Sequence, residues 1–201
     1  MKTLLQIKSS LNGDDGQSSY LSNQFVQRWQ QQNPGGRVVV RDVAASPVPH
    51  LDGERFNAFL TPAEKRTPTE QSIVDYSDEL IAELKSADVV TIGLPMYNFG
   101  IPSTLKAYFD HIARSGVTFQ YTSNGSEGLL PAIPVYVLAA RGGLYAGTQA
   151  DSQTGYMQAF LGFLGLTDTH FIYAEGIAMG PEGKDKALAG AEQEIDRTLA
   201  A

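Results

Sequence analysis

The sequence contains no cysteine and only three histidines. The missing cysteines exclude disulfides, thiolate metal sites, iron–sulfur clusters and cysteine nucleophiles. The histidines are scattered without the spacing of metal ligands, so we expect no metal site. No apolar run reaches the length of a membrane helix, and the apolar start of the chain is interrupted at Gln6 and Lys8. We therefore expect no signal peptide, no membrane partner and a cytoplasmic location.

Charged side chains are also scarce. They make up 18% of the 201 residues, against 42% for the hydrophobic set. This balance excludes disorder and indicates that part of the surface is covered by another molecule. The net charge is −7, so we expect no binding to the phosphate backbone of nucleic acids. The length fits a single domain over residues 1–201.

Short β-branched runs alternate with helical periodicities along the chain, which predicts a parallel sheet with crossover helices. Five strands are expected, at 3–8, 38–40, 89–94, 134–140 and 169–175. Helices are expected at 18–31, 69–86, from Pro102 onward, at 154–164 and at 182–200. The pattern predicts a doubly wound α/β domain with three layers, α/β/α.

Three segments are longer than the connections of such a fold require. Residues 43–68 are expected to contain a short helix. Residues 115–129 indicate a hairpin, and we place its tight turn at Asn124-Gly125. Residues 141–153 form a long loop that opens with Arg-Gly-Gly. Loops of this length in compact domains are more often functional than idle.

The loop after the first strand, residues 9–19, is rich in hydroxyl groups and contains no Lys or Arg. The following helix N-terminus offers unpaired N–H groups and a positive dipole end, which suffice to bind one phosphate monoester. The hydroxyls of Ser10 and Ser18 would be further donors. The loop lacks the glycine patterns of nucleoside triphosphate and dinucleotide sites. The alternative is that Ser18 is an ordinary N-cap in a solvated loop.

Two later loops have features that suit a planar ring. The third strand runs into the sequence MYNF at 96–99, which places aromatic faces and backbone amides at its carboxyl end. The fourth strand runs into RGG at 141–143, where glycines let N–H groups approach the pyrimidine end of a flavin. The alternatives are a turn with packed aromatic side chains at 96–99 and a merely flexible turn at 141–143.

The order of these loops strengthens the functional interpretation. They follow the first, third and fourth strands, which lie side by side in a flavodoxin-like sheet of strand order 2-1-3-4-5. In that arrangement the three loops converge at the switch point of the sheet, where FMN binds.

Together these motifs resemble those of the FMN-dependent NADH:quinone oxidoreductase and azoreductase family, bacterial azoreductases in particular. The combination of MYNF at 96–99 with RGG at 141–143 is specific to that family. The resemblance runs nearly end to end and includes KSS at 8–10, QS at 17–18, DVAA at 42–45, LDGE at 51–54, SDELIAEL at 77–84, GVTF at 116–119, FLGF at 160–163 and AEG at 174–176.

The resemblance implies a role for particular residues. It implies that the FMN phosphate is bound by Ser10, Gly16, Gln17 and Ser18. It implies that the isoalloxazine ring is contacted by Pro95, Met96, Tyr97, Asn98, Phe99, Ala140, Arg141, Gly142, Gly143 and Tyr145. It further implies a substrate pocket, partly across a homodimer interface, that contains Tyr121, Phe163 and Tyr173.

The chain departs from the family pattern at a few positions. Ala140 stands where the family often has Ser, and Tyr145 stands where it often has His. Tyr145 can donate its hydroxyl to flavin or substrate, but it cannot act as a near-neutral acid as His does. Asp14 and Asp15 would oppose a phosphate unless they point outward.

The implied function is two-electron transfer by a ping-pong mechanism. NADH or NADPH would be the co-substrate, and quinones and aromatic azo compounds would be the acceptors, azo compounds being cleaved to amines. The implied protein is a homodimer that buries aromatic side chains, which would account for the scarcity of charge. The alternative is a non-enzymatic flavodoxin-like electron carrier or redox sensor, although the three long segments would cover a flavin rather than expose it.

Overall fold

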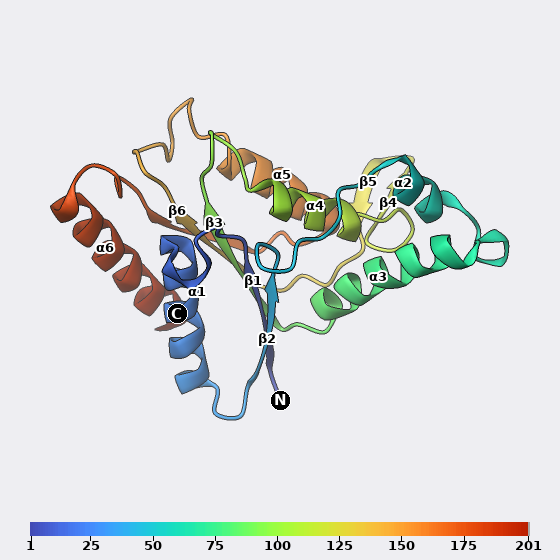
Figure 1. The fold of residues 1–201 in the computed structure, drawn as a ribbon. Coiled ribbons are helices and arrows are strands. Elements are labelled where there is room, and N and C mark those ends of the chain that lie inside the picture. The colour runs from blue at the N-terminus through green and yellow to red at the C-terminus, as the bar shows by residue number, and fades with distance from the viewer. Residues whose placement is uncertain (201) are drawn as a thin grey trace.

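The computed structural model describes residues 1–200, and a parallel five-stranded sheet lies at its centre (Figure 1). In sheet order the strands are β2 (Arg37–Asp42), β1 (Thr3–Lys8), β3 (Val89–Pro95), β6 (Val135–Ala140) and β7 (Thr169–Ala174). Counted within this sheet alone, the order is 2-1-3-4-5. The predicted doubly wound, flavodoxin-like topology is therefore confirmed, with its switch point between β1 and β3.

Helices cover both faces of the sheet (Figure 1). One face carries α1 (Gln17–Gln32) and α6 (Pro181–Ala200). The other carries α3 (Pro68–Lys85), α4 (Ser103–Ile112) and α5 (Thr154–Leu164). This arrangement confirms the predicted three-layer α/β/α architecture. Among residues 1–200, none of the helices combines the length and the apolar character that a bilayer crossing requires.

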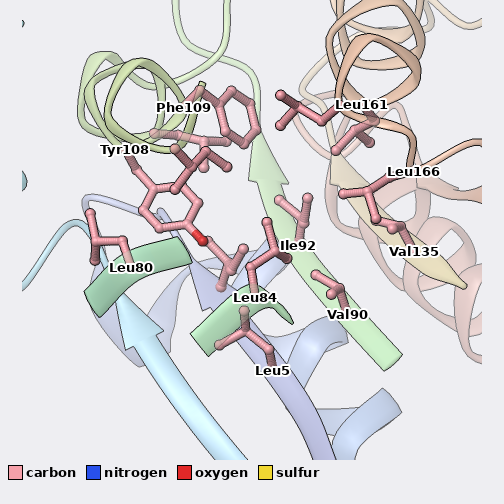
Figure 2. Close-up of a cluster of buried hydrophobic side chains, with 14 of the residues drawn as sticks. Leu5, Leu80, Leu84, Val90, Ile92, Tyr108, Phe109, Val135, Leu161 and Leu166 are labelled. Carbon is pink, nitrogen blue, oxygen red and sulfur yellow. The ribbon is translucent and has the colours of Figure 1, made fainter. Parts of the chain in front are cut away.

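Alternating side chains of the strands build a separate apolar core on each face of the sheet. Leu4 belongs to the cluster under α1 and α6, together with Phe25 and Trp29. Its neighbour Leu5 belongs to the cluster under α3, α4 and α5 (Figure 2). All seven residues of β3 are buried, as expected for a central parallel strand with helices on both faces.

Tyr108 is the exception to the apolar character of the larger core. Its ring lies among Leu5, Leu80 and Leu84, and its hydroxyl points into the cluster (Figure 2). Among the described residues that hydroxyl has no hydrogen-bond partner, and the side chain is fully buried. Burial raises the pKa of the phenol well above its ordinary value. An unpaired buried hydroxyl of this kind destabilises the folded state.

Two of the three long segments contain the elements that were predicted for them. The first contains a short helix, α2 (Gly53–Leu60), whose N-cap Asp52 accepts a hydrogen bond from the Arg55 N–H. The second forms the hairpin β4 (Phe119–Thr122) and β5 (Gly125–Gly128). Single 3-10 turns lie at η1 (Gly13–Asp15) and η2 (Ala63–Lys65).

Two local predictions are wrong by one residue. The hairpin turn is Ser123-Asn124, because Thr122 pairs with Gly125 and the glycine takes the left-handed conformation, with φ of 117°. Pro102 is the N-cap of α4 rather than its first helical residue, since its ψ of 136° is extended. Both shifts move an element boundary and leave the path of the chain unchanged.

Candidate functional site

The loops that follow β1, β3 and β6 converge at one cleft of about 240 Å³. In Figure 1 the loops after β3 and β6 rise next to each other at the top of the molecule. The cleft is lined by Ser10, Asn12, Gly16, Gln17, Ser18, Pro95, Met96, Tyr97, Ala140, Arg141, Gly142 and Ile177. It lies at the carboxyl ends of the strands, beside the switch point, where ligands bind in this architecture.

A second hollow, of about 280 Å³, continues the cleft, because Met96 and Gly142 line both. Its other lining residues are Asn98, Phe99 and Tyr145. We call the combined feature the groove. Its serine end is formed by Ser10, Gly16, Gln17 and Ser18. Its aromatic end is formed by Asn98, Phe99 and Tyr145.

The groove brings together nearly all residues that the sequence predicted to bind a cofactor. The exception is Gly143, which lies beneath the phenol of Tyr145, so close that an added Cβ would be 2.8 Å from the tyrosine oxygen. Asn12 and Ile177 line the groove without having been predicted. No sequence motif indicated either residue, because only the folded path of its segment brings it to the groove.

The serine end leaves hydrogen-bond donors without protein acceptors. Helix α1 begins at Gln17, and its N-cap is Gly16, which has no side chain to cap the helix. Among residues 1–200, the N–H groups of Gln17, Ser18 and Ser19 have no acceptor. The Ser18 hydroxyl is buried and likewise has no partner in this part of the chain. The alternative in which Ser18 is the N-cap is therefore wrong.

Close packing explains why residue 16 is a glycine. Its backbone angles, φ −70° and ψ 137°, suit any residue. A Cβ at this position would, however, lie 2.0 Å from the Ser10 Oγ. The missing side chain therefore lets the Ser10 hydroxyl lie against the start of the helix. Hydroxyls and unpaired helix N–H groups together form a site for a small anion.

The two aspartates of this loop do not project into the groove. Both are exposed, and neither lines the groove. Asp14 pairs with the ammonium group of Lys8, which is buried at the end of β1. The hydrogen bond from Lys8, assisted by one from Asn23, holds the pKa of the Asp14 carboxyl below its ordinary value. The charge of Asp14 is thus paired with Lys8 outside the groove.

The MYNF segment forms a two-residue tight turn. Tyr97 and Gly100 exchange both backbone hydrogen bonds, at 3.1 and 2.9 Å. Asn98 and Phe99 between them have φ of 50° and 60°. A bulky residue such as Phe rarely adopts the left-handed region, so this turn is strained. The turn places the Phe99 ring at the rim of the groove, where the residue is 59% exposed.

Tyr97 connects this turn to the serine end. Its hydroxyl accepts a hydrogen bond from the Leu11 N–H at 3.0 Å and lies 3.5 Å from the Ser10 Oγ. The phenol therefore spans the distance between the loop after β1 and the loop after β3. One aromatic side chain fixes the relative position of these two loops.

The glycine loop presents backbone donors at the aromatic end. The carbonyl groups of residues 141–143 accept hydrogen bonds from the N–H groups of residues 176–178, at 2.9 to 3.2 Å. Among the described residues, the N–H groups of Gly142, Gly143 and Leu144 have no acceptor. Gly142 lines the groove, so its N–H group is placed to meet a ligand.

Arg141 lines the groove through its backbone only. Its side chain has no exposed area, and its guanidinium lies between α5 and the segment after β7. Tyr145, by contrast, extends its ring over the loop and meets Phe99 edge-on, with 5.7 Å between ring centroids. The aromatic pair therefore closes the outer rim of the groove.

The three residues predicted for a substrate pocket do not meet within one chain. Tyr121 on β4 is 73% exposed and lines another hollow, of about 410 Å³, with Phe56 and Phe59. Phe163 packs on Phe119, with 4.3 Å between ring centroids. The Tyr173 hydroxyl lies 2.8 Å from the Thr154 hydroxyl. None of the three predicted residues lines the groove.

Comparison with known proteins agrees with this geometry. Residues 1–199 match the family described as Flavodoxin-like fold. The chain is 60% identical to an FMN-dependent NADH:quinone oxidoreductase of Cellvibrio japonicus over the full length of both proteins. It is 55% identical to a protein of the same name from Paraburkholderia phymatum, with 97% of this chain and 98% of that protein covered.

The chain belongs to the FMN-dependent NADH:quinone oxidoreductase family, with a flavodoxin-like fold. The resemblance inferred from the motifs is therefore confirmed. Among solved structures, an FMN-dependent NADH-azoreductase of Bacillus anthracis in complex with FMN has a TM-score of 0.89 and 27% identity. That comparison covers 100% of this chain and 98% of the other. That structure contains FMN, the cofactor that the groove of this chain was predicted to bind.

Proposed function

We propose that this chain is one flavodoxin-like domain that binds FMN in the groove and transfers two electrons from NADH or NADPH to quinones and aromatic azo compounds. The observation that carries the proposal is a groove with N–H donors at both ends that have no acceptor among residues 1–200. When bound, FMN supplies the redox chemistry, accepting a hydride and passing electrons to the acceptor. Azo cleavage to two amines requires four electrons and hence two such rounds.

The donors at the serine end fit the phosphate of FMN. The N–H groups of Gln17, Ser18 and Ser19 carry the positive end of the α1 dipole, which favours a dianion. The hydroxyls of Ser10 and Ser18 complete a neutral donor set, and the Ser18 hydroxyl has no other partner among residues 1–200. These residues bind and orient the ligand, and none of the four serine-end residues has a cationic side chain.

The aromatic end fits the isoalloxazine ring. Tyr97, Phe99 and Tyr145 offer ring faces and edges for stacking. The Gly142 N–H group would donate to the pyrimidine edge, where negative charge develops on reduction. The aromatic pair at the rim would exclude water from the reacting face.

The groove lining contains no carboxylate and no imidazole. The chain therefore acts by holding rings in a reactive geometry and by stabilising charge through backbone donors. Tyr145 is the one lining phenol at the rim of the aromatic end, and it is placed to donate a hydrogen bond to an acceptor oxygen.

We further propose that the chain is a homodimer. Three large apolar side chains, Phe56, Leu60 and Tyr121, are 53%, 63% and 73% exposed around one hollow between α2 and β4. Contiguous apolar surface of this kind is typical of an interface. A partner would contribute its Tyr121 and Phe163 to a substrate pocket that one chain does not complete. A cytoplasmic location goes with this proposal, because pyridine nucleotides are intracellular reductants.

A turnover assay tests the proposal directly. The purified chain is reconstituted with FMN, and the oxidation of NADH and of NADPH is followed with a benzoquinone and with an azo dye as acceptor. We expect turnover with both acceptors. Bound FMN without turnover for any pair would instead favour an electron carrier or redox sensor. Sedimentation velocity checks the dimer, and Leu60→Glu should shift it toward the monomer.

A further inference from the structure

Behind the aromatic end lies a buried polar network centred on Arg141. The Arg141 guanidinium contacts the Gln153 Oε1 at 3.2 Å, the Thr154 Oγ1 at 3.1 Å, the Asp151 Oδ1 at 3.0 Å and the Glu175 Oε1 at 3.1 Å. All of these partners lie outside the groove lining. A fully buried arginine needs such partners, because an unpaired buried charge is costly.

One arm of this network reaches the strained turn. Gln153 is fully buried, and its side-chain amide donates to the carbonyl groups of Pro95 at 2.9 Å and Gly100 at 3.0 Å. These carbonyls lie before and after the residues with positive φ, so one amide fixes both ends of the turn. The Ser152 hydroxyl donates to the Phe99 carbonyl within the same turn.

The orientation of the Gln153 amide follows from its neighbours. Arg141 has donors only, so the amide oxygen must face it and the NH₂ group must face the turn. Both N–H groups and the oxygen of the amide are then used. Arg141 thereby determines which side of Gln153 meets the turn.

The other arm reaches the glycine loop. The Glu175 carboxylate accepts hydrogen bonds from the N–H groups of Tyr145 at 3.0 Å and Ala146 at 2.9 Å, as well as from Arg141. It fixes the backbone from which the Tyr145 ring extends. Arg141 therefore links the loop that carries Phe99 to the loop that carries Tyr145, from behind the groove.

We propose that Arg141, Gln153 and Glu175 form a positioning relay that fixes these two loops relative to each other and so sets the affinity of the chain for the flavin ring. The inference rests on the proposed function, since it concerns the same groove. The three residues act through the backbone of the loops and make no contact with the ligand through their side chains. Substitutions of these residues should therefore weaken binding of the flavin ring and leave binding of the phosphate unchanged.

Riboflavin and FMN separate the two ends of the groove in an experiment, because riboflavin has the same ring and no phosphate. Dissociation constants for both are measured by quenching of flavin fluorescence, for the wild-type chain and for Gln153→Leu and Gln153→Glu. Gln153→Glu keeps the size of the side chain and the acceptor for Arg141 but removes both donors to the turn, so it tests the relay even if Gln153→Leu does not fold. Loss of two hydrogen bonds of ordinary strength corresponds to about tenfold in affinity.

In each Gln153 variant we expect the dissociation constants of FMN and of riboflavin to rise by the same factor, about tenfold. The visible absorption band of bound FMN should change shape in these variants. Ser18→Ala should weaken FMN alone. Ser77→Ala is the matched control, because it removes a fully buried hydroxyl that donates to the His111 carbonyl at 2.6 Å, away from the groove. It should lower thermal stability and leave both affinities unchanged.

The outcomes separate the relay from the function on which it rests. Gln153 variants that lose thermal stability as Ser77→Ala does, yet bind both flavins like wild type, would overturn the relay. Weakening of FMN without weakening of riboflavin would also overturn it, since the effect would then lie at the serine end. A wild-type chain that binds neither flavin would overturn the proposed function itself.

Discussion

The serine end of the groove leaves its donors without protein acceptors, whereas the polar groups behind the aromatic end are paired with one another. At the serine end, the N–H groups of Gln17 and Ser18 and the Ser18 hydroxyl have no partner among residues 1–200. Behind the aromatic end, Gln153 uses every donor and acceptor of its amide, and Arg141 faces two carboxylates.

This contrast separates two ways of preparing a binding site. The serine end is completed by the ligand, so a bound anion would stabilise the chain by filling unmade hydrogen bonds. At the aromatic end the Gly142 N–H group also lacks an acceptor among residues 1–200, but the protein itself holds Asn98 and Phe99 in an unfavourable conformation before any ligand arrives. Variants at the serine end should therefore change stability differently with and without ligand, whereas variants behind the aromatic end should change stability even without ligand.

The largest effect is expected from Arg141→Leu. This change leaves the carboxylates of Asp151 and Glu175, 7% and 13% exposed, without their cation. Breaking a buried ion pair in this way typically costs about 3–5 kcal/mol of unfolding free energy. Urea denaturation without ligand measures it. Arg55→Leu is the control, because its pair with Asp52 is more exposed and should contribute less than about 1 kcal/mol. Equal losses in the two variants would contradict the prediction.

A smaller effect with a distinct pH dependence is expected from Asp151→Asn. Burial opposes ionisation of Asp151, but hydrogen bonds from Thr154 and the charge of Arg141 hold its pKa below the ordinary value of 3.8. A carboxyl with a lowered pKa stabilises the fold above its unfolded pKa, and this stabilisation is lost as the pH falls through the folded pKa. At neutral pH the substitution should cost about 1.5–3 kcal/mol.

The pH dependence is measured as the urea midpoint of unfolding at a series of pH values below about 4. The wild-type midpoint should fall more steeply with acidification than that of Asp151→Asn. Asp14→Asn removes the acidic residue paired with Lys8 at the serine end, whose pKa is lowered as well. Because Asp14 is exposed, its removal should change the acid dependence less. A larger change for Asp14 than for Asp151 would reverse the comparison.

The contrast also explains how much of the site could be predicted from the sequence. The groove lining is formed by hydroxyls, glycines and aromatic side chains that follow strands directly, so sequence position and strand order sufficed to place Ser10, Met96 and Gly142. The contacts within the relay could not be predicted in this way. Gln153 and Glu175 are 12 and 34 residues from Arg141, and no periodicity or motif pairs them before the chain folds.

The conformation of Phe99 and the N-cap of α1 also could not be predicted from local sequence preferences. Positive φ is unfavourable for Phe99, so a sequence rule would place a glycine there. The buried amide of Gln153 and the Ser152 hydroxyl hold the turn in this conformation through hydrogen bonds that local rules do not include. Ser18 is a residue type that caps helices, yet the cap is Gly16, because the close approach of Ser10 excludes a side chain at that position. In both cases tertiary packing overrides the local preference.

Gly16→Ala is expected to act at the serine end alone. The added methyl group would collide with the Ser10 hydroxyl, and such overpacking typically costs about 1–3 kcal/mol. Displacement of the loop should weaken FMN and leave riboflavin binding unchanged, as fluorescence titration with both ligands would reveal. Gly53→Ala at the start of α2 is the control, because an added Cβ there meets no atom within 4 Å. Equal weakening of both flavins would show that the two ends are coupled.

The smallest effects, and the sharpest test of the contrast, come from two unpaired buried hydroxyls. Without ligand, Ser18→Ala and Tyr108→Phe should each raise the unfolding free energy by about 1 kcal/mol, because each removes a hydroxyl that has no partner among the described residues. With saturating FMN, Tyr108→Phe should remain more stable than wild type. Ser18→Ala should become less stable than wild type, because the hydroxyl then donates to the phosphate. Urea denaturation with and without FMN measures both, and Ser18→Ala without this change of sign would mean that the ligand does not complete the serine end.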